Sequence, residues 1–208
     1  MKTIDGIRYE IDETEAKVIF SDKSIETANI LSEVEGKPVT AIWHDAFFSH
    51  ISLTSVVIPN SVTKICKEAF SHCKSLKIVN IPESVTEPGW AAFAYCESLE
   101  SIYIPDKVTK ISAYAFHSCS SLESIRIPNS VTIIDDMAFV NCESLKTITI
   151  PDNIQIISKN AFQGCYNIQH VRFSQALVDH PDADRIFYQL FNAGLRTREV
   201  LLRKPTAF

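Results

Sequence analysis

The chain has 208 residues, of which 46% are hydrophobic, and a formal net charge of −5. A net negative charge argues against a general nucleic-acid binder, because such a protein needs a basic surface that replaces the counterions of the phosphates. No apolar run approaches the roughly 18 residues of a membrane-spanning helix, so we expect no membrane insertion.

We expect residues 1–45 to form an N-terminal cap, made of a β-hairpin and a distorted first coil. Apolar and polar residues alternate over positions 7–11, which predicts a strand, and positions 17–20 are its predicted partner across a polar turn. Positions 30–42 contain a distorted first repeat. Such irregularity is expected, because the first coil of a stacked array must cover an open sheet edge.

The opening stretch, MKTIDGIRYEIDE, holds no apolar segment, so we expect no signal peptide in the chain as given. A cytoplasmic protein and a secreted protein whose leader has already been removed both fit this observation. The location of the protein therefore stays open at this point.

Residues 46–173 repeat with a period of 23 residues. An Ala-Phe pair occurs six times on that step, Ile-Pro occurs five times, and cysteine follows at positions 73, 96, 119, 142 and 165. A fixed period between about 20 and 50 residues is the signature of a repeat architecture. A solenoid with a cap at each end fits a chain of this length.

Each repeat has three parts. Leu-x-x-Ile-x-Ile predicts a short strand with one face in the core, and the proline that follows ends the strand because it has no N–H to donate. Val-Thr-x-Ile predicts a second strand or extended segment, since Val, Thr and Ile favour an extended backbone. Ser/Asp-x-x-Ala-Phe-x-x-Cys predicts one to two turns of α- or 3₁₀-helix, capped at equivalent positions by Ser112, Asp135 and Ser158.

Two columns of side chains should run through the core. The phenylalanines from Phe47 to Phe162 are predicted to point inward and stack. Stacked strands place equivalent residues about 4.8 Å apart with parallel side chains, whereas a disulfide needs convergent side chains with Cβ atoms about 3.8 Å apart. We therefore interpret the five repeated cysteines as buried, reduced thiols, with disulfides or zinc as the alternative. Cys66, at a predicted helix N-terminus, is either an incidental small residue or a reactive thiol of lowered pKa.

A few residues depart from the repeat. Pro88 replaces the inward isoleucine of the second strand and should interrupt that strand, and His50 replaces the repeated cysteine. Trp43 and Trp90 lie where the coil is irregular. We predict that they cover local gaps; exposure of Trp90 beside Pro88 would instead mark a contact site.

Residues 174–208 leave the repeat and are predicted to form a C-terminal helical cap. Proline and aspartate suit the first turn of a helix over residues 182–193, and glycine suits its exit. We expect the apolar stripe of this helix to cover the last coil, with binding of a partner as the alternative. The stripe consists of Ile186, Phe187, Leu190 and Phe191.

The pattern Leu-x-x-Ile-x-Ile-Pro-x-x-Val-x-x-Ile-x-x-x-Ala-Phe-x-x-Cys resembles the BspA-like leucine-rich repeats. The match covers about residues 46–173, and Gly36-Lys37-Pro38-Val39 is also typical of the family's first coil. The resemblance implies a right-handed leucine-rich-repeat solenoid with a parallel β-sheet on one face. It also implies a surface protein of bacteria or mucosal protozoa, with a role in adhesion or protein recognition and host extracellular-matrix proteins among its partners. It carries over no active site.

The outer face of the predicted parallel sheet is the candidate binding surface, since solenoids commonly bind through an extended exposed face. Tyr103 and Arg126 should lie on neighbouring strands, and Tyr and Arg are enriched at binding hot spots. A solvated sheet surface with no ligand is the alternative. The candidate binding residues are Tyr103, Arg126, Arg172, Asn80 and His170.

The sequence offers little to a catalytic or metal site. The six histidines occupy different repeat positions, with no His-x-x-x-His or Cys-x-x-Cys pair, and no glycine-rich phosphate loop is present. We therefore expect no metal, no cofactor and no enzymatic activity. The leading hypothesis is a recognition or adhesion module that binds a protein or glycan. The alternative is a structural spacer, or a fragment of a larger surface protein, with no ligand of its own.

Overall fold

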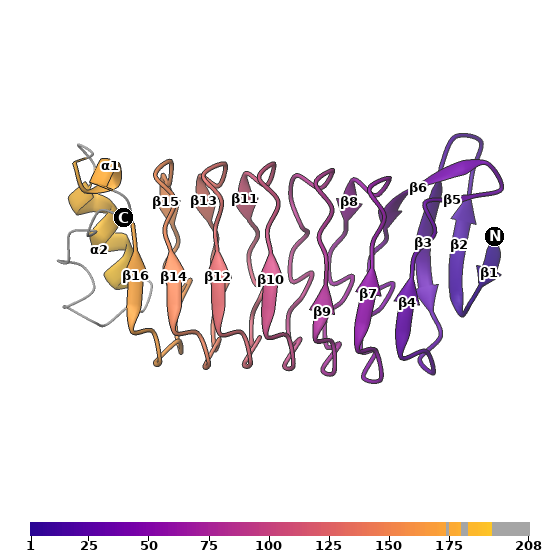
Figure 1. Ribbon diagram of the computed structural model, residues 1–208, viewed down its shortest axis with the longest axis horizontal. Helices are drawn as coiled ribbons and strands as arrows, with labels where there is room; N and C mark the ends of the chain where they lie inside the picture. Colours follow the sequence, from indigo (N-terminus) through magenta and orange to yellow (C-terminus); the bar gives the residue numbers. More distant parts are fainter. Residues whose placement is uncertain (174, 180–182, 193–208) are drawn as a thin grey trace.

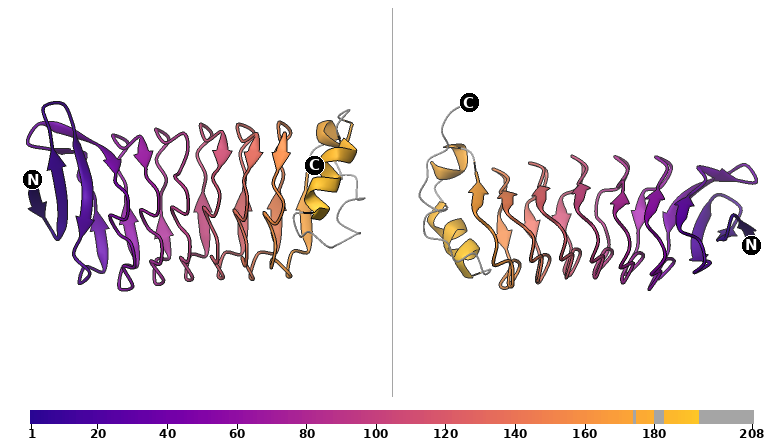
Figure 2. Two further views of the ribbon diagram at one scale, coloured as in Figure 1. Left: turned by 180° about the vertical axis from the view of Figure 1, so that it is seen from behind. Right: turned by 60° about the horizontal axis from the view of Figure 1, so that its bottom comes forward.

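A computed structural model describes residues 1–173, 175–179 and 183–192, which form an elongated solenoid (Figure 1). The coils stack along the long axis, with the N-terminal strands at one end and two short helices at the other (Figures 1 and 2). Strands on two sides of the coils pair in parallel with their equivalents in neighbouring coils. The predicted repeat solenoid with parallel sheets is therefore confirmed.

The N-terminal cap converts antiparallel pairing into parallel pairing. The predicted hairpin is present: β2 (Ile7–Ile11) and β3 (Ala16–Ser21) pair antiparallel, with β1 (Lys2–Ile4) on the outer edge of β2. β3 then pairs in parallel with β6 (Lys37–Ile42), whose hairpin partner is β5 (Glu33–Val34). β6 also pairs in parallel with β8 (Lys64–Ile65), a strand of the repeat region. The cap therefore continues directly into the solenoid.

The first sheet holds the Leu-x-x-Ile-x-Ile segments. Equivalent residues pair across neighbouring coils, as Ile102 does with Ile125, so like side chains form columns. The central residue of each repeat strand is buried, and the following Ile-Pro leaves the ladder. The ladder has two parts, β4-β7-β9 and β10-β12-β14-β16. The strands are β4 (Thr27–Asn29), β7 (Ser55–Val57), β9 (Ile78–Val79), β10 (Ser101–Tyr103), β12 (Ser124–Arg126), β14 (Thr147–Thr149) and β16 (His170–Arg172).

The second sheet holds the Val-Thr-x-Ile segments, and it is interrupted. β8 (Lys64–Ile65) pairs with β6, while β11 (Lys110–Ile111), β13 (Ile133–Ile134) and β15 (Ile156–Ile157) form a separate ladder. In Figure 1 the coil between β8 and β11 has no arrow at this level. Pro88 lies in that coil, which confirms the predicted interruption.

The third side of each coil is a turn edge, and the short helices predicted there are wrong. Residues 1–173 contain no α- or 3₁₀-helix. An α-helix satisfies its N–H groups within itself, but here alternate N–H groups donate to the next coil, as Phe93 does to the carbonyl oxygen of Ala115 at 3.0 Å. Two residues of each repeat take a positive φ to allow this. They are Asp45, Glu68, Ala91, Tyr114, Met137 and Asn160 before Ala-Phe, and Ser49, His72, Tyr95, Ser118, Asn141 and Gly164 after it.

The predicted phenylalanine spine is confirmed. Six buried rings stack from Phe47 to Phe162 with centroids 4.9 to 5.8 Å apart, and the largest separation lies between Phe93 and Phe116. All six cysteines are free. Each of the five repeated thiols donates to a phenylalanine carbonyl of an earlier coil, as Cys119 Sγ does to Phe93 O at 3.3 Å. The cysteine column therefore adds a hydrogen bond as well as apolar volume.

The C-terminal cap contains α1 (Gln175–Val178) and α2 (Ala183–Asn192). Ile186 and Leu190 are buried and Phe187 packs on Phe173, but Phe191 is 55% exposed, so the predicted four-residue stripe is too wide. The ends of the predicted helix and residues 193–208 lie outside the described residues. No helix in the described part of the chain is long and apolar enough to cross a membrane.

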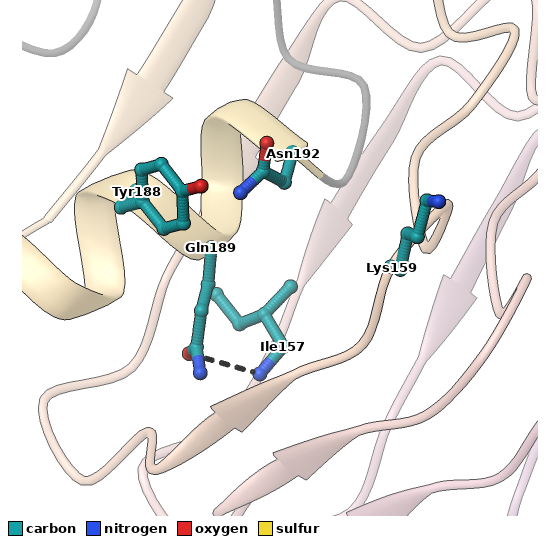
Figure 3. Close-up of a pocket in the computed structure, with 5 residues that line it drawn as sticks. All are labelled: Ile157, Lys159, Tyr188, Gln189 and Asn192. Carbon is teal, nitrogen blue, oxygen red and sulfur yellow. Dashed lines mark hydrogen bonds between the residues drawn. The ribbon is translucent and has the colours of Figure 1, made fainter.

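Side chains of α2 also satisfy the open edge of the second sheet. The Ile157 N–H donates to Gln189 Oε1 at 3.3 Å (Figure 3). Arg185 Nη1 donates to the Gln155 carbonyl at 2.6 Å. An edge strand offers unpaired backbone groups to other chains. The helix therefore covers backbone groups of β15 as well as apolar surface.

Candidate functional site

The outward residues of the first sheet form two columns, because its paired strands share one register. Neighbours in a column of such a sheet are about 4.8 Å apart. Within each of the two ladders the face is thus a regular grid of side chains. One column contains Ser55, Ile78, Ser101, Ser124, Thr147 and His170, and the other contains Val57, Asn80, Tyr103, Arg126, Thr149 and Arg172.

Tyr103 and Arg126 are brought together as direct neighbours in one column. Tyr103 is 49% exposed, and its hydrogen bond with Glu83 raises the pKa of the phenol. Arg126 Nη1 lies 3.2 Å from Asp106 Oδ1 in an exposed ion pair. Such a pair is screened by water and weakly held, so both side chains can exchange these partners for groups of a ligand.

Arg172 lies in the same column as Arg126, separated from it by one strand, with Thr149 between them. His170 occupies the other column of the same strand, β16, and both side chains are exposed. These two residues are therefore close to each other at the C-terminal end of the face, and they do not adjoin Tyr103.

Asn80 has a different surrounding from the other candidate residues. Its Nδ2 donates to the Ile58 carbonyl at 3.0 Å, and its Oδ1 accepts the Ile58 N–H at 3.1 Å. The side-chain amide thus takes the place of a backbone partner at the end of β7. Both polar atoms already hold partners within the fold.

The exposed side chains of this face change from apolar to cationic along the solenoid. Val57 and Ile78 are 56% and 69% exposed and, with Tyr103, form an apolar N-terminal half. The C-terminal half instead carries Arg126 and Arg172. Exposed apolar side chains on neighbouring strands are a feature of interaction surfaces, and Tyr and Arg supply a large share of binding energy at protein interfaces.

A second group of rings, half-buried except for the exposed Trp90, lies along the turn edge, and the sequence analysis did not find it. His72 stacks on Tyr95 with centroids 4.2 Å apart, and His117 Nε2 lies 3.1 Å from the Tyr95 hydroxyl. Trp90 and Tyr114 are 5.4 Å apart and continue the row. His72 and Tyr95 occupy equivalent repeat positions, whereas Trp90, Tyr114 and His117 each occupy a different one. Because no single column of the repeat carries all five rings, the period alone does not mark the group.

Trp43 and Trp90, predicted to cover local gaps, are 40% and 43% exposed. A lysine ammonium lies over each ring: Lys17 Nζ is 5.4 Å from the Trp43 centroid and Lys67 Nζ is 4.9 Å from the Trp90 centroid. Such cation–π contacts fix the ring orientation. Each tryptophan thus contacts a lysine that precedes it by one strand or one coil while keeping a substantial exposed area.

The thiols and the buried histidine are poor candidates for chemistry. Burial raises the pKa of Cys66, against the hypothesis of a reactive thiol, and raises that of Cys73 and of Cys119 to about 12. A protonated thiol is a weak nucleophile. His50 is buried with Nε2 2.6 Å from the Asp22 carbonyl oxygen, and burial lowers its pKa. Among the residues with described positions, no cluster of histidine, cysteine, aspartate and glutamate could hold a metal ion.

A pocket of about 350 Å³ lies between α2 and β15 (Figure 3). One of its amides, Gln189, already accepts the Ile157 N–H. The pocket therefore results from the way the cap helix meets the sheet edge. Its described lining residues include no carboxylate, imidazole or thiol; they are Ile157, Lys159, Tyr188, Gln189 and Asn192.

Comparison with protein families gives one match, to the BspA type leucine rich repeat region, with six copies over residues 40–181. No curated protein matches the chain.

Among solved structures, the chain is similar to the leucine-rich repeat protein of T. pallidum, with 25% identity and a TM-score of 0.77 over 93% of this chain and 97% of that one. A leucine-rich repeat protein of Bacteroides ovatus is 31% identical, with a TM-score of 0.77 over 82% of this chain and 46% of that one. A leucine rich cell surface protein of Faecalibacterium prausnitzii is 27% identical, with a TM-score of 0.64 over 83% and 54%. The chain thus spans about half the length of the last two proteins.

Proposed function

Because the chain belongs to the BspA-type leucine-rich repeat family, whose members are commonly interaction or surface modules, we propose that it is a non-enzymatic recognition module that binds a protein through the outer face of the first sheet. The observation that carries the proposal is the placement of Tyr103 and Arg126 as neighbours on adjacent strands, where the apolar part of that face meets the cationic part. A glycan is the second ligand class that the family resemblance suggests.

The proposed residues have distinct roles. Tyr103 supplies the central apolar contact and a hydroxyl, Arg126 supplies a planar array of donors, and Arg172 extends the cationic surface two strands further. His170 lies beside Arg172 at the rim of this surface. Asn80 acts indirectly, since its amide holds the end of β7 next to the contact area.

A cell-surface location and extracellular-matrix partners form part of the proposal. The solved protein of Faecalibacterium prausnitzii is described as a cell surface protein, and the family resemblance supports the same location here. A structural spacer is the competing function. It is favoured by one observation, that the chain spans only about half of two similar proteins.

The test is a panel of immobilised matrix proteins and mucosal glycans, probed with the protein by biolayer interferometry. The triple variant Tyr103→Ala, Arg126→Ala and Arg172→Ala should weaken any interaction by about 30-fold or more, since hot-spot side chains contribute about 2 kcal/mol or more. Its thermal stability should stay nearly unchanged, because all three side chains are exposed.

The matched control carries three alanines on the second sheet, at the exposed positions Lys64, Thr109 and Gln155. It should bind like the unmodified protein. A partner that binds the triple variant and the unmodified protein equally well would exclude the sheet face, and a panel with no partner at all would favour the spacer.

A further inference from the structure

Three sets of hydrogen bonds join neighbouring coils, one in each sheet and one along the turn edge. All three are present between the coil of β10 (residues 99–121) and the coil of β12 (residues 122–144). There β10 pairs with β12, β11 pairs with β13, and the Phe116 N–H donates to Ala138 O at 2.9 Å. This interface serves as the reference for the one that precedes it.

The first sheet is broken at the preceding interface, between the coil of β9 (residues 76–98) and the coil of β10. β9 and β10 belong to separate ladders. At the reference interface the Glu123 N–H donates to Glu100 O at 3.1 Å, but no equivalent bond from Glu100 to Lys77 exists in the described structure. Backbone pairing on this side of the solenoid therefore stops between β9 and β10.

The second sheet is broken in the same coil. Pro88 leaves no strand beside β11, and it is the Ser112 hydroxyl that donates to Pro88 O, at 2.6 Å. One backbone bond remains, from the Thr109 N–H to Thr86 O at 3.2 Å, longer than the 2.9 Å of its equivalent from Thr132 to Thr109. Side chains add to this bond, since Ser112 Oγ lies 3.2 Å from Glu87 Oε1 and Lys110 Nζ lies 3.7 Å from the same oxygen. Backbone pairing is thus absent from the first sheet and reduced to one bond in the second.

The turn edge, in contrast, is continuous across the same interface. The N–H groups of Ala91, Phe93 and Tyr95 donate to the next coil at 3.0, 3.0 and 2.7 Å. Ring contacts reinforce these bonds, since Trp90 packs on Tyr114 and the Tyr95 hydroxyl lies 3.1 Å from His117 Nε2. The backbone bonds between the two coils are therefore concentrated along the turn edge. On the two sheet sides side-chain contacts replace most of them, as the hydrogen bond between Tyr103 and Glu83 does on the first.

Gly89 gives a physical reason for the break. A Cβ atom at this position would lie 2.6 Å from the backbone carbon of Cys66, so glycine lets the β9 coil sit unusually close to the coil before it. Toward the following coil the Phe93 and Phe116 centroids are 5.8 Å apart, the widest step of the spine, against 5.4 Å between Phe70 and Phe93. The backbone at Gly89 is thus held to the preceding coil, where its N–H donates to Ile65 O at 2.8 Å.

We infer that the interface between the β9 coil and the β10 coil is a hinge whose axis is the turn edge. The solenoid consists of two stiff arms, one ending at β9 and the other beginning at β10, and it bends by opening and closing the two sheet sides. Ile78 and Tyr103 lie on opposite sides of the hinge. Bending therefore changes the distance between the outward side chains of the first ladder, which ends at β9, and those of the second ladder, which begins at β10. This holds whether or not the face binds a partner.

Two pairs of spin labels, attached through a noncanonical amino acid that leaves the cysteines untouched, test the hinge in the full chain. The pair at Ser55 and Ser124 spans three coil steps and crosses the hinge, while the pair at Ser101 and His170 spans three steps at the same repeat position within one arm. The distance distribution of the crossing pair should be about twofold wider. Equal widths overturn the hinge, irrespective of any ligand-binding result.

Hydrogen exchange gives a second measurement at matched positions. The Thr109 amide, whose bond crosses the hinge, should exchange about tenfold faster than the Thr132 amide at the equivalent position of the reference interface. Exchange at the same rate contradicts local opening.

A repaired variant tests the cause. The triple substitution Glu87→Lys, Pro88→Ile and Gly89→Ser installs the residues found at positions 110–112. It should slow exchange of the Thr109 amide to the rate of Thr132 and narrow the crossing distribution to that of the within-arm pair. A folded variant that keeps the wide distribution refutes the assignment to Pro88 and Gly89, and if the variant does not fold, the label pairs in the unmodified protein decide.

Discussion

Replacing Phe139 with alanine tests the stacked core most directly. Phe139 is fully buried, with its ring centroid 5.4 Å from that of Phe116 and 5.2 Å from that of Phe162. Removal of a buried phenylalanine ring costs about 3–5 kcal/mol, because apolar contacts are lost and a cavity remains. With a stacked ring on either side, Phe139→Ala should reach the upper end, about 5 kcal/mol.

The magnitude has an internal check in Phe162, which is equally buried but stacks on one phenylalanine among the described residues. A single aromatic pair contributes about 0.5–1.5 kcal/mol. Phe162→Ala should therefore cost about 1 kcal/mol less than Phe139→Ala. This comparison separates ring stacking from burial alone.

The assay is equilibrium unfolding in urea, followed by circular dichroism and by tryptophan fluorescence to test whether the transitions coincide. Tyr166→Ala is the control, because its side chain is 78% exposed and its removal should change stability by no more than about 0.5 kcal/mol. If Phe139→Ala costs no more than this control, the buried spine is refuted. Equal costs at positions 139 and 162 would refute the contribution of stacking.

The remaining predictions concern the thiols and the histidines. In the native protein at pH 8, Cys66 should react with a thiol reagent before the five repeated cysteines, because those are buried and burial raises the pKa of Cys119 to about 12. In denaturant without reductant, thiol titration should count six free thiols. A lower count would contradict the prediction that the repeated cysteines are reduced. Burial lowers the pKa of His50 and of His117 below the ordinary value of 6.5, so below that pH the unfolded chain binds protons that the folded chain does not. The free energy of unfolding should therefore be highest above pH 6.5 and decrease as the pH falls toward the folded-state pKa values. The urea midpoint, measured from pH 8 to pH 5, should fall less steeply in His50→Gln than in the unmodified protein.

Much of the fold could be predicted because the 23-residue period specifies which positions share a column. A side chain that packs between identical side chains of the neighbouring coils is restricted to one residue type, as at Phe116 and Cys119. The restriction appears as the same residue at the same position of each repeat, so a single sequence is enough to detect it. The interruption at Pro88 was predictable for the same reason that the strands were: proline has no N–H for the ladder.

The turn edge could not be predicted, because its geometry is set by backbone groups of the neighbouring coil. The residues with positive φ include alanine, tyrosine, methionine and glutamate, which carry no glycine-like signal for a left-handed conformation. Local helix-capping chemistry therefore favoured a helix that the coil-to-coil hydrogen bonds override.

The candidate face was predictable in position but not in detail. Alternation along the strands placed Tyr103 and Arg126 outward and together, as the structure has them. The double hydrogen bond of Asn80 to Ile58 depends on β9 ending early, which no pattern in the sequence marks. The row of His72, Tyr95 and His117 joins two equivalent repeat positions to a different one, and the contact of Tyr95 with His117 between unlike positions leaves no periodic mark in the sequence.

The directions of the hydrogen bonds between coils bear on how a solenoid of this kind can gain or lose coils. On the turn edge they run from an earlier coil to a later one, as from Phe93 to Ala115, whereas where the chain enters the strands they run back, as from Glu123 to Glu100. Opposed directions prevent the peptide dipoles from summing along the axis as they do in an α-helix. A coil can therefore be gained or lost as a 23-residue unit without adding to a dipole along the solenoid axis, so this term sets no limit on the number of coils.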